Sequence, residues 1–486
     1  MAIRDTERRT VIGTNPYSDT MISRLSIPGL KSPSLTKSFC GFLILACLSG
    51  TDITTAQEQT AQRITFDDAV LIALERNVTI KRGQNILRSQ EITVQSERAD
   101  FLPNLNFSSG MSRNYGSFQN PVTFAVDTRT TSSFNMGASS SINIFNGFAD
   151  VASLQQAQKV LESQEYTFER TRQSVVFNVI NNYLNVILAG ENIRIRQEDV
   201  EAQTRQLERI EEFVRVGMRA VSDLYQQQAT QASSEAQLLD AQSQFEVSKT
   251  RLIQTLQLDP LGEYEFVVPD PDDIPLGIQE YQALDLMRSA FENRPDLRSQ
   301  EVNIDAAADG IRIAKSGFLP RINLSGSFSS RTSCSESLFG CSFSDQLDIN
   351  QSKSLSLSMS IPLFNRWNTK TSVERSRVQY DNAILDLENL QQSVALEVRQ
   401  AYLDYQIAIK RLDVTEKQFT AAEQALLVEQ ERYEIGASTL VELTQSRAAF
   451  VNGSSQRVQA IFRFQFQQKL IEYYQGVLDP AQPLFN

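Results

Sequence analysis

Histidine, the side chain that most often carries acid–base chemistry, is missing from the 486 residues of this chain, and we follow its carboxylates and thiols as the remaining candidates. Without an imidazole there is no Ser-His or Cys-His pair, no histidine general base and no histidine-ligated metal. The sequence also lacks a glycine-rich phosphate loop. We therefore expect no enzyme, no cofactor and no metal site. The 58 acidic residues against 46 basic residues give a net charge of −12, which argues against nucleic-acid binding.

The number of thiols depends on how the amino terminus is processed. Residues 39–48 read FCGFLILACL, an apolar run of signal-peptide length. Basic residues precede this run, among them Arg24, Lys31 and Lys37. Small residues before Gln57 form a plausible cleavage site, so residues 1–56 are interpreted as a secretory signal peptide. The alternative is that the run is a buried helix.

Two cysteines remain in the exported chain, Cys334 and Cys341, both within the polar segment TSCSESLFGCSFSD. Disulfides form in proteins that leave the cytosol. We therefore expect a local disulfide between these residues. The alternative is that they are two unpaired thiols in a loop.

Two carboxylates, those of Asp223 and Glu442, each stand six residues after a glycine, Gly217 and Gly436. A glycine can adopt the positive φ that ends a helix, and acidic residues favour the first turn of the next helix because of its dipole. A ring of such carboxylates around a narrow axis would instead attract cations. The spacing alone leaves both roles open.

The elements that carry these residues occur twice. Five matches appear in the same order at offsets of 217 to 220 residues: FLPNLNFSSG and FLPRINLSGS, INIFN and IPLFN, Tyr183-Leu184 and Tyr402-Leu403, Gly217 and Gly436, and Leu258-Asp259-Pro260 and Leu478-Asp479-Pro480. We interpret residues 57–264 and 281–480 as two repeats of one unit. The Pro-rich residues 265–280 link them, and residues 481–486 form a tail.

Each repeat is predicted to begin with one helix, from Thr65 to about Asp100 and from about Tyr281 to Gly317. A capping box of Thr65 and Asp68 opens the first of these. The predicted strands lie at about 104–113, 132–145, 321–330 and 352–364, and the long helical hairpins that follow them at about 146–258 and 366–476.

The strand segments alternate between apolar and small polar residues, as in LSLSMSI at 355–361. They are about ten residues long, which is the length of a tilted membrane strand. Aromatic residues bracket their helix-side ends, as in an interfacial girdle: Phe101, Phe145, Phe318, Phe364 and Trp367. A half-buried sheet of a soluble protein would alternate in the same way.

Four strands cannot close a membrane barrel, so several chains would have to share one. Two chains would give 8 strands around a filled interior, and three would give 12 strands around some lumen. The Ser, Asn and Gly residues of the polar faces suit water, which favours three or more chains.

The helices are too long for a compact domain. Arg366 to Ile435 contains no Gly and no Pro, and these roughly 70 residues would form a helix of about 105 Å. Both repeats keep a heptad seam of larger, mostly apolar residues, which predicts coiled-coil hairpins: Ile193, Val200, Leu207 and Val214, then Leu412, Phe419, Leu426 and Tyr433.

This duplicated unit of strands and long hairpins resembles the TolC family of bacterial outer-membrane efflux proteins, over about residues 62–480. The resemblance implies an α+β membrane protein that forms a homotrimer. Each chain would contribute four β-strands to a shared 12-stranded barrel in outer-membrane lipid, and its hairpins to a periplasmic tunnel. It also implies two kinds of protein partner: a periplasmic adaptor and an inner-membrane pump of RND or ABC type.

The resemblance further assigns residues at the hairpin tips. The segments VGMRAVSD (216–223) and IGASTLVE (435–442) match the family's tip motif. Six residues would contact the adaptor: Gly217, Met218, Ala220, Gly436, Ala437 and Leu440. Four would line the periplasmic aperture: Asp223, Tyr433, Glu442 and Gln445. Ser438 stands where the family's closing latch has an arginine, and Gln445 replaces an acid of the family's second ring, so the latch and the charge would be partial.

The function that follows is an exit duct of a tripartite efflux or type I secretion system, in the outer membrane with its tunnel in the periplasm. The alternative is a structural or adhesive coiled-coil surface protein anchored in the outer membrane. Such a protein would place its helices outside the cell and would not need a glycine-centred hairpin twice.

Overall fold

The computed structural model of the chain describes residues 62–119, 121–269, 271, 276–335 and 343–478. The predicted signal peptide and the tail at 481–486 lie outside these residues. The first half contains β1 (Gln62–Ile64), α1 (Phe66–Arg76), α2 (Val78–Ala99), β2 (Asn106–Gln119), β3 (Val126–Phe145), α3 (Ala149–Arg215) and α4 (Val221–Leu256). The second contains β4 (Tyr264–Phe266), α5 (Ala283–Asn293), α6 (Pro295–Ser316), β5 (Arg321–Ser335), α7 (Phe343–Ile349), β6 (Gln351–Ser360), α8 (Asn368–Glu434) and α9 (Leu440–Gln475).

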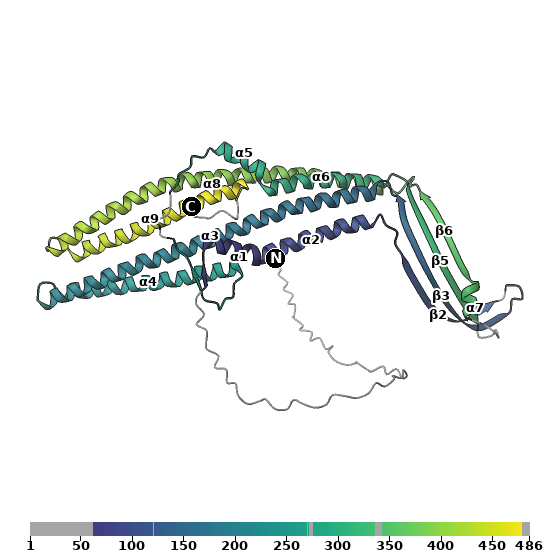
Figure 1. Cartoon of the computed structure of the whole chain (residues 1–486), viewed down its shortest axis with the longest axis horizontal. Helices are drawn as coiled ribbons and strands as arrows, with labels where there is room; N and C mark the ends of the chain where they lie inside the picture. Colours follow the sequence, from purple (N-terminus) through teal and green to yellow (C-terminus); the bar gives the residue numbers. More distant parts are fainter. Residues whose placement is uncertain (1–61, 120, 270, 272–275, 336–342, 479–486) are drawn as a thin grey trace, which may run out of the picture. The chain divides into compact units, whose positions relative to one another are not determined.

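The two halves repeat the same helices at the same lengths. Helices α1 and α5 have 11 residues each, α2 and α6 have 22, α3 and α8 have 67, and α4 and α9 have 36. Figure 1 shows α3 with α4 and α8 with α9 as two long hairpins, with β2, β3, β5 and β6 side by side at the end away from their turns. Among the described residues, no helix combines the length and apolar character needed to cross a membrane.

The prediction of one helix at the start of each repeat is wrong, because each is two helices. The Thr65–Asp68 capping box does open α1, but Asn77 then leaves the helical conformation at ψ 128°. Its side chain accepts a hydrogen bond from the Thr79 N–H and so caps α2. In the second half Pro295 is the first residue of α6 and Arg294 is extended. Proline favours this position because its missing N–H would be unpaired there anyway.

The four long strands form one antiparallel sheet in the order β2-β3-β5-β6. Residues directly opposite each other in such a ladder point to the same face. Phe107 lies opposite Ala138, which lies opposite Phe328. The same register gathers the apolar residues on one face: Phe107, Met111, Phe134, Met136, Ala138, Ile142, Ile322, Leu324, Phe328, Leu355, Leu357 and Met359. The other face carries mainly Ser, Asn and Gly.

The strand ends differ from those predicted. Strand β3 begins at Val126, and β6 ends at Ser360, so Ile361 and Leu363 lie beyond the sheet. Pro362 explains the early end, because proline has no N–H to donate to a ladder. A bulge near the end of β3 pairs Phe145, rather than Ile144, with β5.

The predicted disulfide cannot be followed to its sulfur atoms. Cys334 lies in β5 opposite Ser132. Its side chain and the whole of Cys341 lie outside the described residues. The bond therefore stays a prediction.

The core lies between the helices at the middle of the long hairpins, where short segments cover them. Strand β1 pairs in parallel with β4, which the sequence did not suggest. The Tyr183 hydroxyl of α3 donates a hydrogen bond to Val267 O at 2.9 Å. Ile64 O, at 3.2 Å, is a second acceptor for the same hydroxyl. Burial raises the pKa of this hydroxyl. In the second half, the Tyr405 hydroxyl of α8 donates to Gln279 O at 2.9 Å.

The predicted heptad seam is only partly the buried seam. In α3 all four seam residues are half-buried. The buried positions nearby include the polar residues Asp199, Gln203 and Gln206. Ser234 of α4 donates to Asp199 Oδ2 at 2.9 Å, and Gln227 donates to Gln203 Oε1 at 2.8 Å. Hydrogen bonds between the two helices therefore replace apolar contacts at these positions.

Candidate functional site at the hairpin tips

Each long helix ends in the same hydrogen-bonded turn. The Met218 N–H donates to Phe213 O at 2.8 Å, and the Gly217 N–H donates to Val214 O at 3.1 Å. The same pair of bonds recurs around Gly436, at 2.8 and 3.1 Å. This Schellman motif requires a left-handed residue, and the two glycines have φ of +75° and +76°.

The turns project into open space. A Cβ atom added to Gly217 or Gly436 would meet nothing within 4 Å, so only their backbone conformation requires glycine. Met218, Ala220 and Ala437 are exposed. Leu440 differs from the other residues assigned to adaptor contact, because its side chain is only 5% exposed and packs inside the tip.

Glu442 is the third residue of α9 and caps that helix. Its Oε2 accepts a 2.9 Å hydrogen bond from the Thr439 N–H, and its own N–H donates to Thr439 Oγ1 at 3.3 Å. The N–H of Thr439, followed by the hydroxyls of Ser438 and Thr439, holds the pKa of Glu442 below its usual value. The carboxylate is thus ionised and fixed at the tip.

Asp223 occupies the same position in α4 without such a cap. The residue before this helix is Ala220, which offers no side-chain oxygen. The Asp223 N–H donates to the Ala220 carbonyl at 3.0 Å instead. The two acidic residues are therefore related by the repeat but not by their hydrogen bonds.

Ser438, which the resemblance aligns with a latch arginine, makes its side-chain hydrogen bonds within its own hairpin. Its hydroxyl donates to the carboxylates of Glu429 and Glu442. Arg432 completes this group by pairing with Glu429 Oε2 at 3.0 Å. Among the described residues, the Ser438 hydroxyl has no hydrogen bond to the first hairpin, so it does not link the two hairpins here.

Arg219 provides a link between the hairpins that sequence reasoning missed. Its guanidinium lies 4.5 Å from the centroid of the Tyr433 ring, and its Nη2 donates to Tyr433 O at 3.0 Å. Tyr433 is 3% exposed. An arginine in the turn of the first hairpin therefore covers the tyrosine of the second. The signal was present in the tip segment VGMRAVSD, but its partner lies 214 residues away.

The electrostatics around Tyr433 agree with this placement. Burial raises the pKa of the Tyr433 hydroxyl, the Arg219 charge opposes the rise and the Asp223 charge adds to it. Gln206 approaches the hydroxyl closely enough to affect its pKa, but no hydrogen bond of normal geometry joins them. Asp223 and Tyr433 are thus near neighbours electrostatically, without a direct hydrogen bond.

Apolar packing and one ion pair complete the contact between the hairpins. Arg209 of α3 pairs with Glu434 of α8 at 2.9 Å. An apolar cluster fills the space between the hairpins: Ile210, Leu426, Tyr433, Leu440 and Leu443, flanked by Val214, Leu224 and Phe450. The predicted aperture residues therefore lie at one end of the molecule, with Tyr433 inside and Gln445 exposed.

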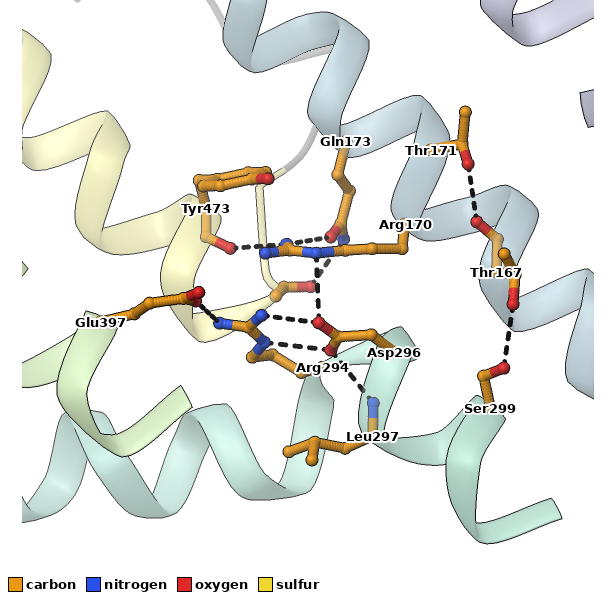
Figure 2. Close-up of polar contacts among 11 residues, drawn as sticks. Thr167, Arg170, Thr171, Gln173, Arg294, Asp296, Leu297, Ser299, Glu397 and Tyr473 are labelled. Carbon is orange, nitrogen blue, oxygen red and sulfur yellow. Dashed lines mark hydrogen bonds and ion pairs between the residues drawn. The ribbon is translucent and has the colours of Figure 1, made fainter. Parts of the chain in front are cut away.

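A second polar cluster joins the two halves of the chain near their middle (Figure 2). Arg294, at the start of α6, bonds both oxygens of Asp296 at 3.0 and 2.6 Å and Glu397 of α8 at 2.7 Å. Arg170 of α3 donates to Tyr473 O at 3.0 Å and lies 4.1 Å from the centroid of the Tyr473 ring. The cluster connects α3, α6, α8 and α9.

The charges in this cluster are compensated inside the protein. Arg294 is 3% exposed. Burial alone would raise the pKa of Asp296, but the hydrogen bonds and charge of Arg294 hold it below its usual value. A desolvated arginine of this kind depends on its carboxylate partners. We regard the cluster as the support that fixes the hairpins at their middle.

Comparison with known proteins finds a match to one family model in each half of the chain. A family model described as "Outer membrane efflux protein" matches residues 70–256 and 286–474. The outer membrane protein TolC of Salmonella enteritidis is 23% identical over 329 residues, which cover 66% of this chain and 65% of that protein. The TolC of Vibrio cholerae is 24% identical over 351 residues, which cover 72% and 76%.

Solved structures share the fold. The CmeC outer membrane channel of Campylobacter jejuni superposes with a TM-score of 0.72 at 19% identity, covering 86% of this chain and 87% of that one. The family model spans most of both repeats, and the fold agrees with it. The chain therefore belongs to the outer membrane efflux protein family.

Proposed function

We propose that three copies of this chain form one conduit across the outer membrane. Strands β2, β3, β5 and β6 of each copy would contribute to a shared 12-stranded barrel, and the long hairpins to a periplasmic tunnel. The conduit is the exit duct of a tripartite efflux or type I secretion system. A periplasmic adaptor would contact the hairpin tips, and an inner-membrane pump of RND or ABC type would deliver the substrate.

The sheet is the observation that carries this proposal. Its apolar face is exposed in the isolated chain: Met111 is 78% exposed and Leu355 is 79% exposed. Soluble proteins rarely expose a continuous apolar face of this kind, whereas lipid would cover it. The opposite face, with Ser325 and Ser356 at its centre, suits a water-filled interior.

The edges of the sheet support a shared barrel. Strands β2 and β6 are the edges of the four-stranded sheet, with 14 and 10 residues respectively. Unpaired backbone groups in lipid cost several kcal/mol each, so each edge needs a partner strand. Pairing β6 of one copy with β2 of the next would close the barrel. Three copies give a lumen, whereas two would give a filled interior.

Purified full-length protein in mild detergent tests the assembly. We expect a mass of three chains by light scattering, and discrete conductance steps in planar bilayers. Protein heated to dissociate the assembly before reconstitution is the control and should give no steps. A monomeric or dimeric mass together with no conductance would overturn the proposal.

A further inference from the structure

Three open pockets lie along the hairpins, and nearly all of the charged residues that line them are basic. The first, of about 440 Å³, lies between α3, α4 and α9 and is lined by Arg196, Arg251 and Arg463 among Asn, Gln and Ser residues. The second, of about 480 Å³, lies between α8 and α9 and is lined by Lys410, Arg411 and again Arg463. Arg463 therefore joins the two pockets.

The third pocket continues the first toward the tips. It has about 560 Å³, shares Arg196 with the first pocket and adds Arg447 of α9. Its one acid, Asp199, accepts a hydrogen bond from Ser234, and its charge also acts on Arg447. The three pockets together are lined by six basic residues and one acidic residue. This is the reverse of the chain as a whole, whose net charge is −12.

Few of these cations are engaged by a side-chain hydrogen bond or ion pair in the described part of the chain. Arg196 donates to Gln237 Oε1 at 2.6 Å. Among the described residues, no hydrogen bond or ion pair engages the side chains of the other five: Arg251, Lys410, Arg411, Arg447 and Arg463. By contrast Arg457, also on α9, pairs with Glu416 at 2.6 Å. Helix α9 therefore carries a paired arginine, Arg457, as well as Arg447 and Arg463, which line the pockets.

The pockets lie on the surface opposite the short strands. Tyr183 points to β1 and β4, and Asn192, nine residues further along α3, lies about half a turn away at about 100° per residue. In α8, Tyr405 points to Gln279 in the segment before α5, and Val414, nine residues further along, again lies about half a turn away. Segments β1 and β4 form an extra layer on one side of the helices. In a tunnel this layer would lie on the outer surface, because it would otherwise fill the lumen. The pockets would then face the lumen.

We infer that Arg463 and the five other cations form an oxyanion-binding zone, which takes carboxylate or phosphate groups of molecules passing through the tunnel. Guanidinium groups bind these planar or tetrahedral oxyanions through paired N–H donors, and the surrounding Asn, Gln and Ser side chains add neutral donors. Such a zone would attract an anionic substrate inside a tunnel whose negative net charge would otherwise repel it. The lumenal position rests on the proposed function, whereas anion binding itself does not.

Calorimetric titration of the full-length protein in detergent with citrate tests the binding directly. We expect Arg463→Gln and Arg251→Gln each to weaken citrate binding about tenfold, the effect of losing one charge-assisted hydrogen bond. Arg457→Gln is the matched control, since it removes the same charge from α9 at a paired position, and it should leave binding unchanged. Inorganic phosphate should compete with citrate, and neutral glycerol should not.

Block of conductance by citrate in planar bilayers then tests the lumenal position. We expect citrate added on the tip side to block the wild-type channel and to block Arg463→Gln less. Absence of citrate binding, or equal loss in Arg457→Gln and Arg463→Gln, overturns the oxyanion zone. Binding without block overturns only the lumenal position, and a protein that binds citrate but never conducts contradicts the conduit instead.

Discussion

The Arg219 guanidinium lies 4.5 Å from the centroid of the Tyr433 ring and also bonds the Tyr433 carbonyl at 3.0 Å. The two residues belong to different repeats and to different hairpins. A cation over an aromatic ring contributes about 0.5–2 kcal/mol, and a hydrogen bond from a charged donor about 1.5–3 kcal/mol. This one side chain therefore makes a substantial share of the polar contact between the tips.

Arg219→Gln should loosen the tips. The substitution removes the charge that lies over the ring while keeping a long polar side chain. If the tips narrow the conduit, we expect a larger single-channel conductance in planar bilayers than for the wild type. Arg215→Gln is the matched control, because the ion pair of Arg215 is with Glu212, inside its own helix α3. Equal conductance in all three proteins would show that this contact does not restrict the aperture.

The tip turns could be predicted from sequence, but the contact between them could not. Gly217 and Gly436 predict the turns because the Schellman motif makes a local demand on the backbone. It needs one residue that tolerates a positive φ. Arg219 gives no such signal, since its partner is set by the packing of two hairpins. Ser438 is the converse case. Its position is predictable, but the direction of its hydroxyl, toward Glu429 and Glu442, depends on the cap of its own helix.

The same distinction explains the outcome for the other elements. The apolar face of the sheet was predictable because the alternation has the period of a strand. The break at Asn77 was not, because asparagine is compatible with a helix interior and its cap is seen only with the Thr79 N–H in place. The buried Asp199 was missed because an apolar heptad seam beside it looked sufficient, whereas Ser234 supplies the hydrogen bond that allows its burial.

Glu442→Gln tests whether the charge at the tip faces the permeating ions. We expect weaker block of single-channel current by Mg²⁺, because fewer carboxylates would attract the divalent cation. Glu442 also caps α9, so the control must lose the cap and keep the charge. Thr439→Ala does this, since it removes the hydroxyl that bonds the Glu442 N–H at 3.3 Å and costs about 1 kcal/mol of helix stability. If Thr439→Ala weakens Mg²⁺ block as much as Glu442→Gln, the effect comes from the cap and not from a ring of charge.

Gly436→Pro tests the tip as the docking point for the adaptor. Proline fixes φ near −65°, against +76° here, and removes the N–H that bonds Tyr433 O. The turn lies far from the sheet, so we expect a folded trimer that no longer supports export. Gly453→Ala is a control within α9: its new Cβ would lie 3.5 Å from the nearest atom, an ordinary contact. Export that survives Gly436→Pro would place the docking point elsewhere.

The polar cluster of Figure 2 should make the folding stability of the protein decrease in acid. The pKa of Asp296 is held below its usual value, so its contribution to stability is present above about pH 4 and is lost as the pH falls through the lowered value. We expect the midpoint temperature of thermal unfolding to stay constant down to about pH 4 and to decrease at lower pH. Asp296→Asn should be less stable at neutral pH and should lose less on acidification. Asp305→Asn, an exposed position on α6, should follow the wild-type curve.

Arg294→Met should be among the most destabilising single changes in the periplasmic part of the chain. Arg294 is 3% exposed and bonds Asp296 and Glu397, so methionine would leave a partly buried carboxylate without its closest counter-ion. Breaking a buried pair from one side costs about 3–5 kcal/mol, although Arg170, 3.6 Å from Asp296, offsets part of this. Denaturant unfolding of the purified protein should show the loss as a lower midpoint. The control is Arg298→Met on the same helix, where an exposed pair with Glu301 contributes about 0.2–1 kcal/mol. Equal midpoints for the two variants would mean that the cluster does not hold the hairpins together, because a supporting role requires Arg294 to matter more than an exposed arginine one turn away.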